Sequence, residues 1–161
     1  MENKEEFTSN KNGMGRRIRI TLDIVENLNQ SSLGKFGDRG NKAEYIQRQK
    51  RLLGLTTEEK PISSKFNLNY MGSLWKKELY ISTKENEFIY YECDANPEEG
   101  RAFSPSCETK FPVWGNVVLE YRFHKTYLKD WQKIHADVIR FVGDMEVGPN
   151  KLFNPVFDIG D

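Results

Sequence analysis

The chain has 161 residues, and its 24 Lys and Arg residues balance 24 Asp and Glu residues, so the formal net charge is +0. This length fits one ordinary domain. A neutral chain lacks the broad basic field on which binding to nucleic acid or to anionic membranes usually depends. Aromatic residues make up 12% of the chain and bring large side chains to bury. Composition therefore predicts a folded domain and no nucleic-acid partner.

The two ends of the chain differ in pattern from its middle. Residues 1–15 are polar and show no apolar period, which predicts a disordered lead-in. A Gly-Pro pair at 148–149 ends the last periodic segment, so residues 149–161 are predicted to form an irregular tail. Residues 16–148 are then one domain. The opening residues are too polar for a secretory signal, and no run reaches the roughly 18–20 apolar residues that a membrane span needs.

In the first half of the domain, residues 16–24 predict a strand, because Ile18, Ile20, Leu22 and Ile24 alternate with polar residues. Three glycines mark residues 31–40 as a loop, and their spacing does not match a phosphate-binding motif. Residues 41–53 repeat apolar side chains at helical spacing, and Gly54 follows as a C-cap. We therefore expect a strand, a loop and a helix in this order.

The second half predicts four more strands and a long helix. The strands are expected in the later part of 74–82, over 88–93, over 108–114 and over 117–123. The strand at 108–114 is predicted to lie at a sheet edge, because Pro112 has no N–H to donate to a central ladder. A helix capped by Thr126 follows, with an apolar stripe that includes Trp131 and Ile134 and reaches Met145.

This order of elements predicts an α+β fold. We expect an antiparallel sheet of about four to five strands, covered on one face by the helix of the N-terminal half and by the long C-terminal helix. The residues on the apolar stripe around Trp131 are expected to form the core.

Two cysteines, Cys93 and Cys107, are 14 positions apart, with Pro97, Gly100 and Pro105 between them. This spacing favours a disulfide that closes a loop. In the chain-entropy model such a bridge contributes about 3 kcal/mol, and it persists only in an oxidising compartment. The alternative is a pair of unpaired buried thiols in a cytosolic protein.

Motifs for catalysis or metal binding are missing from the sequence. His124 and His135 belong to no HExxH pattern, and neither has a cysteine near it for zinc. We expect no catalytic residue, no metal site and no cofactor. Two alternatives stay open: a small envelope hydrolase in which an Asp or Glu works with His124 as acid and base, and a structural component of a secretion assembly.

One stretch of the chain is strongly acidic. Between Lys84 and Arg101 six carboxylates and no cation give a formal charge of −6. A rigid acidic loop steers and orients a basic partner. We therefore predict a partner-binding surface formed by Glu92, Asp94, Glu98, Glu99 and Arg101. The alternative is an ordinary solvated strand exterior, and a calcium site is disfavoured because the EF-hand loop pattern is missing.

Two blocks of sequence carry a resemblance to a known family. The first comprises residues 43–55 (AEYIQRQKRLLGL), 69–75 (NYMGSLW) and 78–82 (ELYIS). The second comprises Cys93, the Pro-Ser-Cys run at 105–107, Tyr-Arg-Phe at 121–123 and a Leu-x-x-Trp-x-x-Ile pattern at 128–134. Across residues 41–145 the chain resembles small cell-envelope immunity proteins of Gram-negative bacteria that are encoded beside antibacterial effectors of the type VI secretion class.

The resemblance implies an immunity protein that binds a cognate effector toxin and occludes its functional surface, without catalysis. Such proteins are typically exported or anchored, whereas no export segment is visible here. The resemblance therefore implies a periplasmic location if a leader or anchor has been removed, and a cytoplasmic one otherwise. The binding surfaces of immunity proteins vary with their toxins, so the family supplies no contact residues. The oligomeric state is left open.

Overall fold

The computed structural model describes residues 18–24, 47, 50–55, 60–74, 76–84, 88–95, 105–114 and 117–146. The predicted lead-in, the loop at 31–40, the C-terminal tail and most of the predicted helix at 41–53 lie outside these residues.

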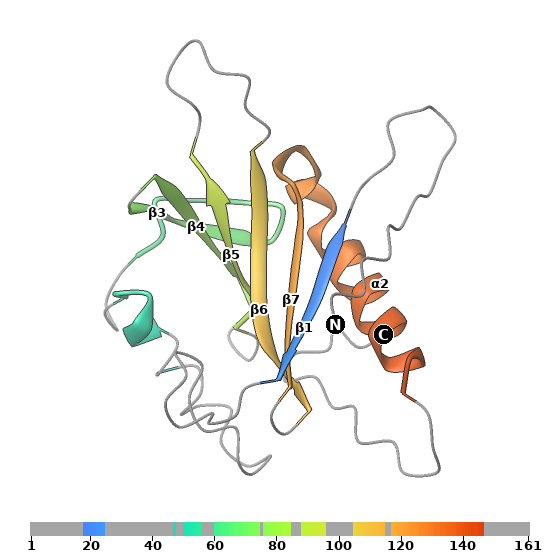
Figure 1. Cartoon of the computed structure of the whole chain (residues 1–161). Coiled ribbons are helices and arrows are strands. Elements are labelled where there is room, and N and C mark those ends of the chain that lie inside the picture. Colours follow the sequence, from blue (N-terminus) through green and yellow to red (C-terminus); the bar gives the residue numbers. More distant parts are fainter. Residues whose placement is uncertain are drawn as a thin grey trace.

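The described residues form one antiparallel sheet of seven strands in the order β1-β7-β6-β5-β4-β3-β2 (Figure 1). Strands β2 to β7 are a meander, in which each strand pairs with the next one along the chain. Strand β1 pairs with β7 at the far edge. The strands are β1 (Arg19–Ile24), β2 (Ser63–Lys65), β3 (Leu68–Leu74), β4 (Lys77–Ser82), β5 (Tyr90–Asp94), β6 (Ser106–Trp114) and β7 (Val117–His124).

Alternating side chains explain the strands that the sequence predicts well. In β7, Leu119, Tyr121 and Phe123 are buried, while Glu120 and Arg122 between them are partly exposed. In β1, Ile20 and Leu22 pack against the same core. The period of two thus places one face of each strand inside the protein.

The sheet has seven strands, so the prediction of four to five strands is wrong. Strands β2 and β3 are not predicted from the sequence. All three residues of β2 are exposed, so this strand has no apolar alternation to reveal it. The β2–β3 connection is a two-residue turn in which Phe66 (φ 58°) and Asn67 (φ 60°) both have left-handed backbones. Such primed turns are common in hairpins but are usually marked by Asn-Gly or Asp-Gly.

The prediction that the strand containing Pro112 is an edge strand is also wrong. Strand β6 lies between β5 and β7. The β5 pairing of the described residues, however, covers only Glu92↔Glu108 and Cys93↔Cys107. Pro112 lies beyond this stretch and next to a register shift against β7, so its missing N–H interrupts no ladder with β5.

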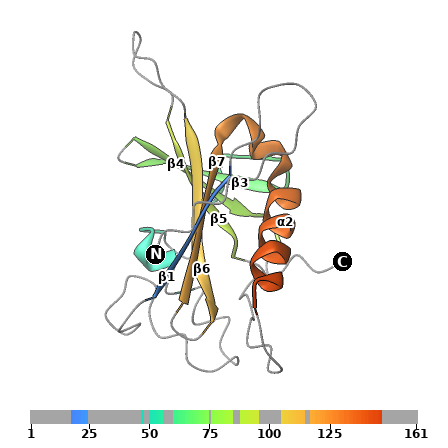
Figure 2. The same cartoon turned by 45° about the vertical axis from the view of Figure 1, so that its right-hand side comes forward.

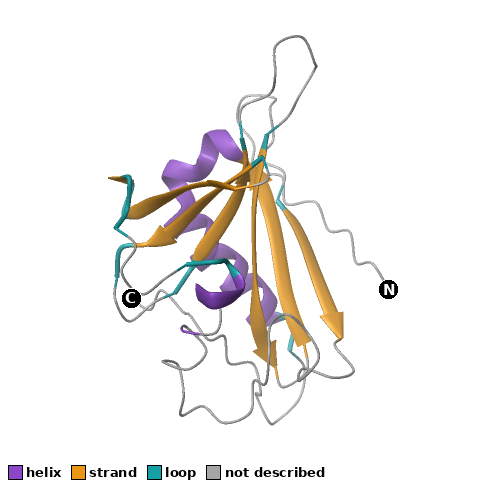
Figure 3. Ribbon diagram, turned by 90° about the vertical axis from the view of Figure 1, so that its left-hand side faces the viewer, coloured by secondary structure: helices purple, strands orange, loops and turns teal. Residues whose placement is uncertain are grey.

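A long helix, α2 (Trp131–Asp144), covers one face of the sheet (Figures 2 and 3). Its predicted apolar stripe is confirmed in part: Trp131, Ile134 and Val138 are buried, whereas Met145, the predicted end of the stripe, is 40% exposed. The start of the helical region differs from the prediction. A 3-10 helix, η1 (Lys125–Asp130), precedes α2, and its N-cap is His124, whose side chain accepts a hydrogen bond from the Thr126 N–H.

The described end of the predicted N-terminal helix lies on the other face of the sheet. Lys50, Arg51 and Leu52 are helical, and Gly54 ends the helix with φ 73°. The Gly54 N–H bonds to the Arg51 carbonyl and the Leu55 N–H to the Lys50 carbonyl, which confirms the predicted C-cap. Lys50 lies over the Phe88 ring, and Figures 1 and 2 place this turn across the sheet from α2, not beside it.

Candidate protein-binding site

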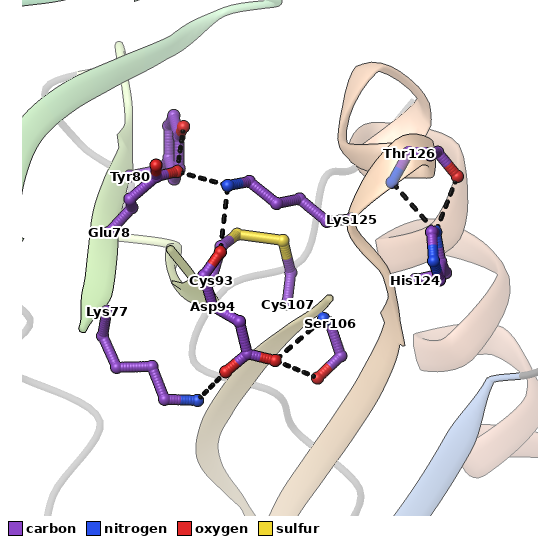
Figure 4. Close-up of a disulfide and its surroundings, with 10 residues drawn as sticks. All are labelled: Lys77, Glu78, Tyr80, Cys93, Asp94, Ser106, Cys107, His124, Lys125 and Thr126. Atoms are coloured by element: carbon purple, nitrogen blue, oxygen red, sulfur yellow. Dashed lines mark hydrogen bonds and ion pairs between the residues drawn. A yellow bond between two sulfur atoms is a disulfide. The ribbon is translucent and has the colours of Figure 1, made fainter. Parts of the chain in front are cut away.

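A disulfide joins β5 to β6 and confirms the predicted pairing of the two cysteines (Figure 4). Cys93 and Cys107 lie directly opposite each other in the two strands, and both are fully buried. The bond closes the loop that carries three of the six carboxylates of the acidic stretch, Asp94, Glu98 and Glu99. It therefore fixes the ends of β5 and β6, the strands that flank residues 96–104 in the sequence.

The carboxylate of Asp94 fastens these strand ends together. It accepts hydrogen bonds from Lys77 Nζ at 2.6 Å, from the Ser106 N–H at 3.0 Å and from Ser106 Oγ at 3.2 Å (Figure 4). Burial by itself raises the pKa of the Asp94 carboxyl, but the bonds from Lys77 and Ser106 outweigh this and hold it below the ordinary value of 3.8. The Asp94 carboxyl is therefore ionised, and it links β5 to Lys77 of β4 and to Ser106 of β6.

Lys125 makes a second set of contacts on the other side of the disulfide. Its Nζ lies 2.7 Å from Glu78 Oε2 and donates to the Asp94 carbonyl at 2.9 Å. Glu78 also accepts a hydrogen bond from the Tyr80 hydroxyl at 2.8 Å. Burial, followed by the contact with Glu78, raises the pKa of Tyr80. The Tyr80 hydroxyl therefore stays protonated and is the donor in its hydrogen bond with Glu78.

Backbone hydrogen bonds complete this frame. The Ala95 N–H donates to the Lys76 carbonyl at 2.9 Å, and the Lys125 N–H donates to the Pro105 carbonyl at 2.9 Å. Residues 95 and 105, which flank the segment 96–104, are thus both tied to neighbouring strands or turns. The segment starts and ends on a rigid base.

The structure places two of the five predicted partner-binding residues. Glu92 and Asp94 alternate in β5 with the buried Tyr91 and Cys93, so both lie on the sheet face opposite α2. Glu92 is partly exposed, whereas the Asp94 carboxylate is already used within the fold. Glu98, Glu99 and Arg101 lie outside the described residues.

The same face carries further charged side chains that are not among the predicted partner-binding residues. Cross-strand pairing aligns Arg19 of β1 with Arg122 of β7, Arg122 with Glu108 of β6, and Glu108 with Glu92 of β5. Arg122 Nη2 and Glu108 Oε2 form an ion pair. We call these four side chains the charged row. The alternation within each strand is visible in the sequence, but the row depends on the register between strands.

A small hollow lies next to the charged row and is open to solvent. It has a volume of about 20 Å³, enough for about one water molecule, and the residues that line it include Glu92, Glu108, Glu120 and Lys110. Glu120 pairs with Lys110 across β6 and β7, one step along from the Glu108 and Arg122 pair. Three acidic residues and one basic residue therefore line the hollow, and Glu108 is already paired with Arg122.

Two tyrosines and one histidine form a buried chain of hydrogen bonds. The hydroxyls of Tyr91 and Tyr121 lie 2.7 Å apart, and the Tyr121 hydroxyl lies 2.9 Å from His135 Nδ1. All three side chains are fully buried between the sheet and α2, to which His135 belongs. His124, the residue considered for an acid–base role, uses Nδ1 to cap η1. These contacts give both histidines a structural role: His135 bonds to Tyr121 in the core, and His124 caps η1.

Neither a metal cluster nor a membrane-spanning helix is found among the described residues. No group of three or more His, Cys, Asp or Glu side chains gathers there in a way that suits a metal ion. No helix in this part of the chain is long and apolar enough to cross a membrane.

Comparison with known proteins gives no relative for this chain. No protein-family model, no curated protein and no solved structure matches it.

Proposed function

We propose that this protein is an immunity protein, which binds a cognate secreted antibacterial toxin and neutralises it by covering the toxin's functional surface. The observation that carries the proposal is the rigid base of residues 96–104, which we call the acidic segment because they include Glu98 and Glu99. The disulfide, the Asp94 carboxylate and two backbone hydrogen bonds fix both ends of residues 96–104. Glu98, Glu99 and Arg101 of this segment are the proposed toxin contacts, together with Glu92.

The physical reason is the cost of ordering a loop when a complex forms. A loop whose ends are already held loses less conformational freedom on binding than a loop with free ends. The negative charge of the stretch between Lys84 and Arg101, to which Glu98 and Glu99 belong, also attracts a basic surface before contact, which raises the association rate and selects among related partners. Both effects serve a protein that has to capture a toxin quickly, and neither needs catalysis.

The disulfide supports a location outside the reducing cytosol. Such bonds persist in oxidising compartments, including the bacterial periplasm. We therefore propose that the protein acts in the periplasm, where it meets an incoming toxin. No cofactor takes part in this function.

The test uses the protein encoded by the adjacent gene as the toxin. The two proteins are co-expressed, their co-purification is measured, and survival of toxin-producing cells is compared with and without this chain. We expect a stable complex and protection. A toxin that stays fully active and unbound in the presence of the wild-type protein would refute the proposed function.

A matched pair of variants tests the acidic segment. Glu98→Gln with Glu99→Gln removes two negative charges, and Asp144→Lys makes the same net change at an exposed position on α2. Because electrostatic steering acts through local charge, we expect association to slow roughly tenfold at low salt in the first variant only. Equal rates in both variants would exclude the segment from the interface.

A further inference from the structure

The two edges of the sheet differ in their protection against pairing with another chain. At one edge, β2 has three residues, all of them exposed, it ends in a lysine, and Pro61 lies just before it. Short edge strands, lysines and prolines are devices by which natural proteins block edge-to-edge association. At the other edge, β1 has six residues in unbroken register with β7 and contains no proline, bulge or lysine. Strand β1 is therefore the edge that can accept a further strand.

The outer side of β1 has both backbone groups and apolar side chains to cover. It is the last strand of the sheet, and no other strand of the described chain lies beyond it (Figure 1). In an antiparallel strand every second residue turns its N–H and C=O away from the inner neighbour, so these groups face outward. Ile20 and Leu22 pack against the core but are only partly buried, and Ile24 is 74% exposed. A strand added beside β1 would pair the backbone groups and cover these side chains.

Residues 18–24, Ile-Arg-Ile-Thr-Leu-Asp-Ile, indicate which strand fits this edge, because they are complementary to themselves. Apolar residues lie at matching distances on both sides of Thr21, and the two charged residues at matching distances have opposite signs. When two copies run antiparallel with Thr21 facing Thr21, Arg19 of each copy faces Asp23 of the other. Both side chains are exposed, and neither forms an ion pair within the described part of the chain. The remaining partners are all apolar: Ile18 with Ile24, and Ile20 with Leu22.

The geometry of antiparallel strands allows this register. Residues directly opposite each other either both direct their N–H and C=O at the partner strand or both direct them away. Two copies of one strand meet this condition when a residue faces its own equivalent across a two-fold axis. Among such registers, only the one centred on Thr21 pairs all residues of 18–24 with one another. It also joins the α2 face of one copy to the α2 face of the other, because opposite residues point to the same side of a sheet.

We propose that the free edge of β1 binds a second copy of this chain, in the antiparallel register centred on Thr21, so that the two sheets become one. Two identical ion pairs between Arg19 and Asp23 form on one face, and apolar pairs extend the core on the other. A second copy fits better than an unrelated strand because it necessarily carries the matching order of charges. The interface is small, so the dimer is reversible, with a dissociation constant in the micromolar range. This inference does not rest on the proposed function.

Sedimentation equilibrium of the purified protein and of two charge variants tests this edge. Arg19→Asp places two carboxylates opposite each other at both symmetric positions of the dimer, and Asp23→Arg places two guanidinium groups there. Because like charges in directly opposite positions destabilise a sheet, we expect the dissociation constant to rise at least about tenfold in each variant. Arg19→Asp is expected to keep the melting temperature of the single copy, since position 19 faces Arg122 within that copy.

A mixture of the two variants tests the register itself. In the mixed dimer, both carboxylates of the Arg19→Asp copy face the two guanidinium groups of the Asp23→Arg copy. We therefore expect the mixture to dimerise more tightly than either variant alone. A single chain with both substitutions is expected to dimerise as the wild type does. The matched control is Asp144→Arg at an exposed position on α2, which makes the same charge change as Asp23→Arg and is expected to leave dimerisation unchanged.

Three results would overturn the inference. A wild type that stays monomeric at every concentration would mean that another segment or partner covers β1. A dimer that persists unchanged in both single variants would place the interface elsewhere. Single variants that lose the dimer but do not recombine in the mixture would exclude the register centred on Thr21. If the charge variants do not fold, Ile24→Lys at an already exposed position serves instead. It opposes an ammonium group to Ile18 of the other copy, and unchanged dimerisation in this variant would also overturn the inference.

Discussion

At the scale of single residues, the buried chain of Tyr91, Tyr121 and His135 shows how polar groups are accommodated in this core. Burial raises the pKa of both tyrosines, and for Tyr121 the neighbouring Tyr91 adds to this, so both phenols stay neutral. The sequence predicts His135 only as a partly buried helix residue. Its full burial follows from the hydrogen bond with Tyr121, because a buried polar group is costly unless it has a partner.

The substitution Tyr121→Phe tests this network. It removes the hydroxyl that links the other two groups, and Tyr91 and His135 each lose a hydrogen-bond partner away from water. We expect the free energy of unfolding to fall by about 1–3 kcal/mol, measured by urea denaturation. The control is Tyr70→Phe, because the Tyr70 hydroxyl bonds to Ser73 at an exposed site. Equal losses in the two variants would contradict the network's contribution.

At the scale of elements, the ends of β5 and β6 are joined by a carboxylate as well as by a disulfide. The pKa of Asp94 in the folded protein is below that of the unfolded chain. A group of this kind stabilises the fold fully above its unfolded pKa, here about 4, and the contribution is lost as the pH falls through the folded pKa. Acid should therefore weaken the frame that holds the acidic segment.

Comparison of the wild type with Asp94→Asn checks this pH dependence. The variant has no charge to lose in acid. We expect it to be less stable than the wild type between pH 5 and 7, and the difference in unfolding free energy to shrink as the pH falls below about 4. Urea unfolding at a series of pH values gives this difference, with Asp144→Asn on α2 as the control. A difference that stays constant with pH would show that the Asp94 charge contributes nothing.

At the scale of the whole molecule, the disulfide joins the two neighbouring strands that have the fewest aligned residue pairs among the described residues. In the described chain, only two residue pairs align β5 with β6, whereas β6 and β7 pair along most of their length. One of these two pairs is the cystine itself. The sheet thus consists of a part from β2 to β5 and a part containing β6, β7 and β1. The disulfide and the core contact of Tyr91 with Tyr121 and Trp131 hold these parts together.

Removal of the bond in Cys93→Ala with Cys107→Ala tests this view of the molecule. We expect a loss of about 3 kcal/mol in unfolding free energy, because the unfolded chain is no longer constrained by the loop. We also expect the amides of β2 to β5 to lose protection from hydrogen exchange before those of β6 and β7. A uniform loss of protection along the chain would mean that the two parts do not separate at this junction.

The sequence by itself determined the features that depend on near neighbours in the chain. The alternation in β7 and through Leu22 of β1, the apolar stripe of α2 from Trp131 to Val138, the Gly54 cap and the cysteine pair were predicted correctly, because each is set by side-chain period or short spacing. The predicted burial of Ile24 and Met145 was wrong, because both side chains are exposed. The acidic stretch was visible for the same reason, although only Glu92 and Asp94 of its proposed contacts fall within the described residues.

Only the tertiary structure decided which side chains meet. The exposed strand β2, the central position of β6 and the placement of α2 and the turn at 50–55 on opposite faces come from long-range pairing. The charged row needs three strand registers at once, and a shift of one residue would move its side chains to the other face. Local pattern fixes the face to which a side chain points, but the partner across the sheet is fixed by the free energy of the whole packed core.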